Sequence, residues 1–209
     1  MDLNIISYSY LFLRLAPFFL VCFFTLSSVL NQDFKGLIYI AGLLLSCFFT
    51  ILIGNALSDF IPQPDGDKPE VCNMISIGST GDISKLPLGQ LVIVFTFGYL
   101  LYPLVYYNLL KQNIPTLIFF PLLLLFDMIW NVKNSCYTPI QIVFSLILGG
   151  LLGVGWGYII DQSKNPALQY FAGSPNGEVC SAPSNTTFKC NVYKNGELIS
   201  QNSMLSNPN

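Results

Sequence analysis

The chain has 209 residues, of which 53% are hydrophobic and only 10% are charged, whereas soluble domains contain about 25% charged residues. It has no histidine, and its nine basic residues stand against eleven acidic ones, so the net charge is −2. These counts exclude a histidine nucleophile, a histidine base, a histidine-ligated metal and a basic surface for nucleic acid. The class that remains is an integral membrane protein with a small polar appendage, for which we expect no cofactor and no metal.

The apolar segments predict an all-α, polytopic membrane bundle. A helix needs about 20 residues to cross the hydrocarbon core, and five stretches are apolar over about that length. The first stretch lacks the basic start and the small-residue cleavage site of a signal peptide, so we interpret it as a retained helix. The expected spans are 10–30, 36–57, 90–110, 115–132 and 139–160, which makes 1–161 a membrane domain and 162–209 a polar extramembrane tail.

The connections between the spans differ greatly in length. Asn31–Lys35 and Lys111–Pro115 are tight turns, Ser58–Gly89 is a long loop rich in proline, glycine and aspartate, and Asn131–Thr138 joins the last two spans. With five spans, the N-terminus, the long loop and the last connection share one membrane face, and the tight turns and the tail share the other. Lysine and arginine near the span ends commonly set the orientation. The two faces carry similar numbers of basic residues, so the orientation stays open. These residues are Arg14, Lys68, Lys85 and Lys133 on the long-loop face, and Lys35, Lys111 and Lys164 on the tail face.

The fifth span carries a face of small residues. Gly149, Gly153 and Gly157 recur every four residues, and such faces let a second helix approach closely, because lipid provides no hydrophobic drive for helix association. We favour packing inside the bundle, and a dimer interface remains the alternative.

Two charged residues fall inside the expected spans on the long-loop side, Arg14 in the first and Asp127 in the fourth. A charge in the bilayer is costly unless it is paired or reaches water. The two residues form an intramembrane ion pair, or Arg14 reaches the lipid headgroups and Asp127 faces water in the loops.

Two loop motifs resemble the type 2 phosphatidic acid phosphatase (PAP2) superfamily, especially its dolichyl-diphosphatase-like branch. Pro87-Leu88-Gly89-Gln90 resembles the second motif of that family, and YTPIQIVFSLILGGLLG, from Tyr137 onward, resembles its third motif and glycine-rich helix. The resemblance implies a PAP2-like bundle with a cleft on the long-loop face. The residues that this implies for the cleft are Asn55, Gln90, Asn131, Asn134, Tyr137 and Gln141.

The same resemblance implies a catalytically dead relative. Family members attack phosphorus with a histidine, protonate the leaving oxygen with another, and hold the phosphoryl oxygens with lysine and arginine. In this chain Gln90 and Tyr137 stand at the histidine positions and Asn131 at an arginine position. These groups supply neither the acid, the nucleophile nor the charge that phosphoryl transfer requires. We therefore expect no enzymatic activity.

The polar tail predicts a β-hairpin, because FKCNVYK and ELIS flank Asn195-Gly196, a pair typical of a type I′ turn. Cys180 and Cys190 lie ten residues apart in the tail, and Cys72 and Cys136 lie on the opposite face. Because disulfides need an oxidising compartment, we expect at most one of these pairs to be bridged and favour Cys180–Cys190, with four free thiols as the alternative. Asn185 begins a glycosylation triplet.

The composition and the tail also resemble membrane proteins of large DNA viruses of algae and protists. That resemblance implies a structural protein of the virion's internal membrane, with membrane lipid and other virion proteins as partners and the tail as the contact point. The alternative is a lipid-headgroup-binding or lipid-transfer protein that uses the former phosphatase cleft. A channel is disfavoured, because no span carries a polar stripe.

Overall fold

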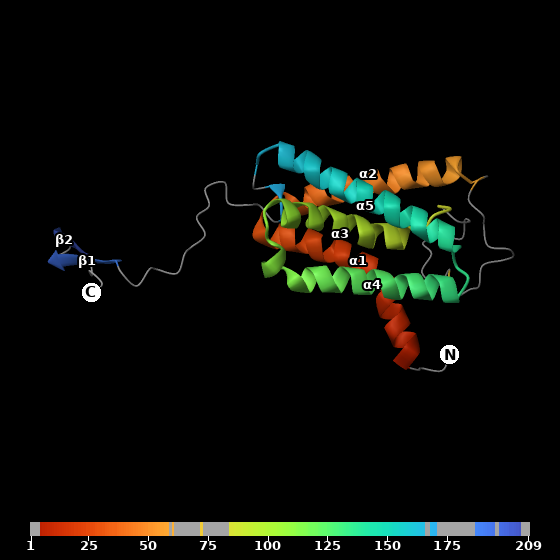
Figure 1. The fold of residues 1–209 in the computed structure, drawn as a ribbon, viewed down its shortest axis with the longest axis horizontal. Coiled ribbons are helices and arrows are strands. Elements are labelled where there is room, and N and C mark those ends of the chain that lie inside the picture. The colour runs from red at the N-terminus through yellow and green to blue at the C-terminus, as the bar shows by residue number, and fades with distance from the viewer. Residues whose placement is uncertain are drawn as a thin grey trace. The chain divides into compact units, whose positions relative to one another are not determined.

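The structure is a computed structural model. It describes residues 5–58, 60, 72, 84–165, 168–170, 187–194 and 197–205, and side-chain environments for 12, 15–58, 60, 72, 84–165 and 168–170. The chain divides into two compact units, 1–173 and 174–209. The first unit is a bundle of five α-helices (Figure 1): α1 (Ile5–Asn31), α2 (Lys35–Ala56), α3 (Leu88–Tyr106), α4 (Ile114–Lys133) and α5 (Pro139–Gln162).

Four of these helices, α2 to α5, are long and apolar enough to cross a membrane. The all-α, multi-pass bundle expected from the sequence is therefore present. The fifth expected span, 10–30, falls on α1, of which only Leu15–Asn31 enters this comparison, so the structure supports four of the five expected spans. The N-terminal part of α1 bends away from the bundle (Figure 1), and Pro17 lies inside this helix, where proline removes a backbone hydrogen bond.

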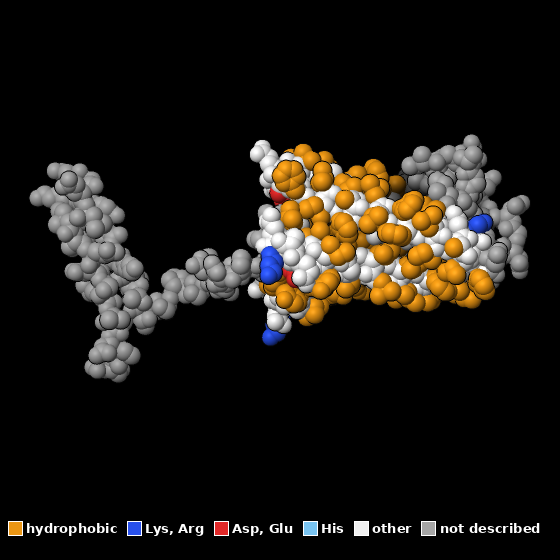
Figure 2. All heavy atoms as spheres, turned by 90° about the horizontal axis from the view of Figure 1, so that it is seen from above, with side chains coloured by type: hydrophobic (Ala, Val, Ile, Leu, Met, Phe, Trp, Pro, Cys, Tyr) orange, Lys and Arg blue, Asp and Glu red, His pale blue; other side chains and the backbone are white. Residues whose placement is uncertain are grey.

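The two ends of the bundle are named here by the segments that leave them. At the loop end, α2 and α4 finish and α3 and α5 begin; at the tail end, α3 and α5 finish and α2 and α4 begin. Helix α3 lies at the centre and is the most buried of the four spans, and its most extensive packing is against α5. On the face that Figure 2 shows, hydrophobic side chains are spread along the length of the bundle and charged side chains lie near its ends. This distribution is the one that a hydrocarbon environment favours.

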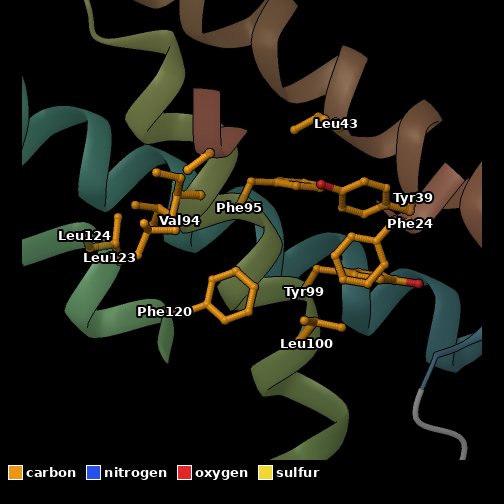
Figure 3. Packing of buried hydrophobic residues seen from close by; sticks show 12 residues of the cluster. Phe24, Tyr39, Leu43, Val94, Phe95, Tyr99, Leu100, Phe120, Leu123 and Leu124 are labelled. Carbon is orange, nitrogen blue, oxygen red and sulfur yellow. The ribbon is translucent and has the colours of Figure 1, made fainter. Parts of the chain in front are cut away.

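The interior of the bundle near the tail end is aromatic (Figure 3). Tyr39 of α2 packs against Phe24 of α1, with ring centroids 4.8 Å apart, and against Phe95 and Tyr99 of α3. The Tyr39 hydroxyl shares a 2.7 Å hydrogen bond with the Thr96 hydroxyl, and both residues are fully buried. A buried tyrosine hydroxyl needs such a partner, so this bond fixes α2 against α3.

Four helices are followed within two residues by a residue with a left-handed backbone, although none of these residues is glycine: Gln32, Asn108, Ser135 and Lys164. After Ser135, the Cys136 N–H donates to the Asn131 carbonyl over 3.0 Å. This bond spans a whole turn and satisfies a carbonyl at the helix end. The left-handed backbone at Ser135 reverses the chain direction and brings Cys136 back toward the end of α4.

The second unit contains two antiparallel strands, β1 (Thr187–Lys194) and β2 (Glu197–Leu205). Their register pairs Thr187 with Leu205 and Lys194 with Glu197, with an irregularity between Val192 and Tyr193. The proposed turn residues, Asn195 and Gly196, lie outside the described residues.

Candidate functional site

The expected cleft residues that the structure describes lie at the loop end of the bundle. The starts of α3 and α5 meet there side by side and in the same direction. The Ser145 hydroxyl of α5 donates to the Pro87 carbonyl over 3.1 Å, and one turn further along, a Cβ on Gly149 would contact Leu91 and Val94. The segments that carry the two family-like motifs therefore begin at the same end of the molecule.

Gln90 lies in the first turn of α3 and is 1% exposed. Within the part of the chain that the structure describes, neither its amide nitrogen nor its amide oxygen has a hydrogen-bond partner. An amide buried in this way carries the full cost of its desolvation. At the loop end, Gln90 is a side chain whose two polar atoms both lack a hydrogen-bond partner among the described residues.

Asn131 is also 1% exposed. Its Nδ2 donates to the backbone carbonyl and to the Oδ2 carboxylate oxygen of Asp127, both over 2.9 Å. Its Oδ1 is buried without a partner among the described residues. Asp127 is thus held by its neighbour on the next turn of α4. The side chain of Arg14 lies outside the described residues, so the Arg14–Asp127 ion pair stays a prediction.

The structure gives Gln141 a local role. Its Oε1 accepts the Thr138 N–H over 2.8 Å, while its own N–H donates to the Thr138 hydroxyl over 3.4 Å. This reciprocal arrangement is a capping box at the start of α5, with Pro139 in the first helical turn. The spacing Thr-x-x-Gln is the sequence signal for it, and reading it as a family motif alone missed the cap.

The remaining cleft candidates are less enclosed. Asn134 and Tyr137 are half-buried between α4 and α5, and Asn55 near the end of α2 is exposed. The Nδ2 of Asn134 donates to the Trp130 carbonyl over 2.9 Å, which closes the end of α4. Gln90, Asn131 and Gln141 are therefore the buried members of the expected set, and Asn55 does not join them.

A disulfide at the same end joins Cys72 of the long loop to Cys136, with Cα atoms 5.5 Å apart across 64 residues of sequence. The expectation that Cys72 and Cys136 stay unbridged was therefore wrong, and so was the alternative of four free thiols, whereas the Cys180–Cys190 bond stays a prediction. The preference for the tail pair rested on the ten-residue spacing of Cys180 and Cys190, whereas the chain reversal after α4 presents Cys136 to Cys72. Cys180 and Asn185 lie outside the described residues. Cys22 and Cys47, in α1 and α2, are free thiols.

The buried side chains at this end are mostly uncharged. Its buried polar side chains are amides and hydroxyls, with the Asp127 carboxylate held by Asn131. Among the described residues no group of three histidine, cysteine, aspartate or glutamate side chains could hold a metal ion. These side chains can donate and accept hydrogen bonds to a ligand, and they offer no cation for a phosphoryl group.

The glycine face of α5 packs inside the bundle. A Cβ on Gly153 would collide with the Phe95 carbonyl, and one on Gly157 would lie 3.3 Å from the Tyr99 carbonyl oxygen. The face expected to mediate close helix contact therefore lies against α3 within the same chain.

A polar cluster at the tail end was not expected from the sequence. Asp161 of α5 accepts hydrogen bonds from Tyr107 over 2.6 Å, Gln169 over 3.1 Å and Tyr102 over 3.4 Å. The hydrogen bond to the Asp161 carboxylate, with burial as a second cause, raises the pKa of Tyr107 to about 12. The chain after α5 also returns to the bundle, where Tyr170 donates to the Phe24 carbonyl over 2.7 Å. The sequence signal for this cluster was Asp161, an acidic residue at the end of an apolar helix.

Comparison with known proteins gives no match among family models, curated proteins or solved structures.

Proposed function

We propose that this chain is a non-catalytic structural membrane protein, anchored by its helical bundle and joined to other proteins through its tail. The observation that carries the proposal is the division of the chain into an apolar bundle, 1–173, and a separate unit, 174–209, that contains the two paired strands. Two strands alone bury little apolar surface and are marginally stable in water. Their free edges favour pairing with another protein.

The buried side chains at the loop end support the non-catalytic part of the proposal. Gln90 and Asn131 lack the titratable groups that acid and nucleophile roles require, and the amides carry no charge to stabilise a phosphoryl group. The resemblance to virus-encoded membrane proteins extends the proposal to the internal membrane of a virion, with capsid or assembly proteins as the partners of the tail.

Deleting Phe188–Asn209 tests the role of the tail. We expect the full chain to insert into membranes and to co-sediment with assembled particles. The truncated protein should still insert, because α2 to α5 are intact, but should be missing from those particles. Removing only the last four residues, 206–209, is the matched control and should leave co-sedimentation unchanged. Co-sedimentation of the truncated protein at the full-length level would make the bundle the contact surface.

Hydrolysis assays test the loss of catalysis. The purified protein should release no phosphate from phosphatidic acid or isoprenyl diphosphates above a detergent blank. The double variant Gln90→His/Tyr137→His should remain inactive, since the cationic phosphate cradle is still missing. Turnover that is lost in Gln90→Ala or Tyr137→Phe would contradict the proposal.

A second candidate, binding of a lipid headgroup at the loop end, is favoured by one observation. Both amide atoms of Gln90 are buried without a partner in the described part of the chain, and a ligand that donates and accepts hydrogen bonds would satisfy them. Native mass spectrometry should then detect lipid on the wild-type protein and on Asn55→Leu, whose residue is exposed, but not on Gln90→Leu. Equal lipid content in all three proteins would remove this candidate.

A further inference from the structure

The strongest unexplained feature is the covalent link at the loop end. Cys72 and Cys136 are bridged, and the sulfur of Cys72 lies 3.9 Å from the backbone carbonyl oxygen of Asn134. Cys136 follows α4 directly, in the short connection before α5. The bridge therefore lies outside the hydrocarbon core, at a defined end of the bundle.

A disulfide at a membrane surface reports the redox state of the compartment that it faces. Such bonds form and persist in oxidising compartments and are rare where glutathione and thioredoxin keep thiols reduced. The charges near the span ends leave the orientation open, because both ends carry lysines: Lys85 and Lys133 at the loop end, and Lys35, Lys111 and Lys164 at the tail end. The disulfide resolves what the charge pattern leaves undecided.

Helix α5 connects the two sides. It begins three residues after Cys136, at Pro139, and its 24 residues end at Gln162. At 1.5 Å per residue it is about 36 Å long, which exceeds the roughly 30 Å of the hydrocarbon core. It is apolar enough to span. The chain that follows α5 therefore leaves the membrane on the side opposite the disulfide.

From these observations we infer that the loop end faces an oxidising compartment, such as the endoplasmic reticulum lumen or the cell exterior, and that the tail lies on the reducing, cytosolic side. Two chemical consequences follow for the tail. Cys190 of β1 is a free thiol rather than half of a bridge with Cys180, and the Asn185 triplet does not receive a glycan, because glycosylation acceptors are modified on the lumenal side. The partners of the tail are then proteins of the cytosol.

The first test is thiol labelling of the full-length chain in sealed microsomes, whose outer face is cytosolic. Cys22, Cys47 and Cys180 are replaced by alanine or serine, which leaves Cys190 and the Cys72–Cys136 pair. A membrane-impermeant polyethylene-glycol maleimide should label Cys190 on intact vesicles without reductant. Two further labels should appear only when detergent and reductant are both present. In the matched variant Cys136→Ser, Cys72 should become labelled in detergent without reductant.

Two labelling results would overturn the inference. One is protection of Cys190 until detergent is added, which would place the tail in the lumen. The other is labelling of Cys72 and Cys136 in detergent without reductant, which would mean that the bridge does not form in the membrane.

Glycosylation provides an independent readout on the same membranes. The variant Ile75→Thr completes an acceptor triplet at Asn73, next to Cys72 in the long loop, and should gain a glycan that endoglycosidase removes. The native Asn185 triplet should not. A glycan at Asn185 would contradict the inference.

Discussion

At the scale of single residues, the bundle satisfies most of its buried hydroxyls locally. Ser46 and Thr50 donate to the carbonyls one turn earlier in α2, each over 2.8 Å, and Thr96 does the same in α3. Lipid offers no hydrogen bonds, so such bonds remove the cost of polar groups in a span. The Tyr99 hydroxyl and both amide atoms of Gln90 have no partner among the described residues, and it is the two unpaired atoms of Gln90 that make it a ligand-binding candidate.

The Tyr107–Asp161 hydrogen bond should stabilise the tail end. Replacing Tyr107 by phenylalanine removes a bond to a carboxylate in a partly exposed site, so we expect a loss of about 1–2 kcal/mol in the free energy of unfolding. Tyr106→Phe is the matched control, because Tyr106 is 61% exposed, and it should change stability by less than about 0.5 kcal/mol. Denaturation in detergent measures both. Equal effects of the two variants would mean that the bond contributes nothing.

The pH dependence of this bond has a defined sign. The pKa of Tyr107 is raised from 10.0 to about 12, so the folded state favours the protonated phenol. The stabilisation is then complete below pH 10 and is lost as the pH rises to about 12. The difference in melting temperature between wild type and Tyr107→Phe should stay constant from pH 7 to 9 and shrink above pH 10. A difference that grows with pH in that range would contradict the assignment.

At the scale of elements, the contact between α3 and α5 organises the bundle. The two helices run in the same direction, and Gly149, Gly153 and Gly157 of α5 meet the backbone or side chains of α3 at successive turns. Close backbone approach gives dispersion contacts that replace the missing hydrophobic drive in lipid. This contact between α3 and α5 contributes to the burial of α3 at the centre of the bundle.

A pair of alanine substitutions in α5 should separate packing from helix propensity. A Cβ at Gly153 would collide with the Phe95 carbonyl, whereas one at Gly155 would meet nothing within 4 Å. We expect Gly153→Ala to destabilise the bundle by about 1–3 kcal/mol through overpacking. Gly155→Ala should be neutral or stabilise by up to about 1 kcal/mol. Thermal unfolding in detergent measures both, and a neutral Gly153→Ala would show that α3 and α5 do not pack this closely.

At the scale of the whole molecule, the Cys72–Cys136 bridge joins the long loop to the connection between α4 and α5. It closes 64 residues of chain that include all of α3 and α4. Closing a long segment lowers the entropy of the unfolded chain. The bridge therefore stabilises the arrangement of several helices at once.

Removing the bridge should lower the stability of the whole bundle. We expect Cys136→Ser to cost about 2–4 kcal/mol, and Cys72→Ser and the double variant to cost the same, because all three remove one bond. Reductant should bring the wild type to the level of Cys136→Ser and leave that variant unchanged. The control Cys47→Ala, at a free thiol in α2, should keep its sensitivity to reductant. A double variant much less stable than either single one would mean that the thiols act separately.

Local physics, readable from the sequence, determined where the helices α2 to α5 begin and end. Runs of about 20 apolar residues suit the hydrocarbon core of a membrane. Helices α2 to α5 begin and end within a few residues of the spans expected from these runs. The glycine period in α5 likewise indicated a close helix contact, because small residues at every fourth position form one face whatever lies against it. The capping box of Thr138 and Gln141 is equally local, so its pattern was present in the sequence.

Only the tertiary structure decided which partners these features meet. A disulfide forms between thiols that the fold brings together, and the reversal after α4 presents Cys136 to a loop cysteine 64 residues away, a pair that spacing along the chain did not favour. The burial of Gln90, the exposure of Asn55 and the cluster around Asp161 depend in the same way on how helices distant in sequence are placed. Apolar helices are specified by their own residues, whereas contacts between them depend on register and packing, which no single segment encodes.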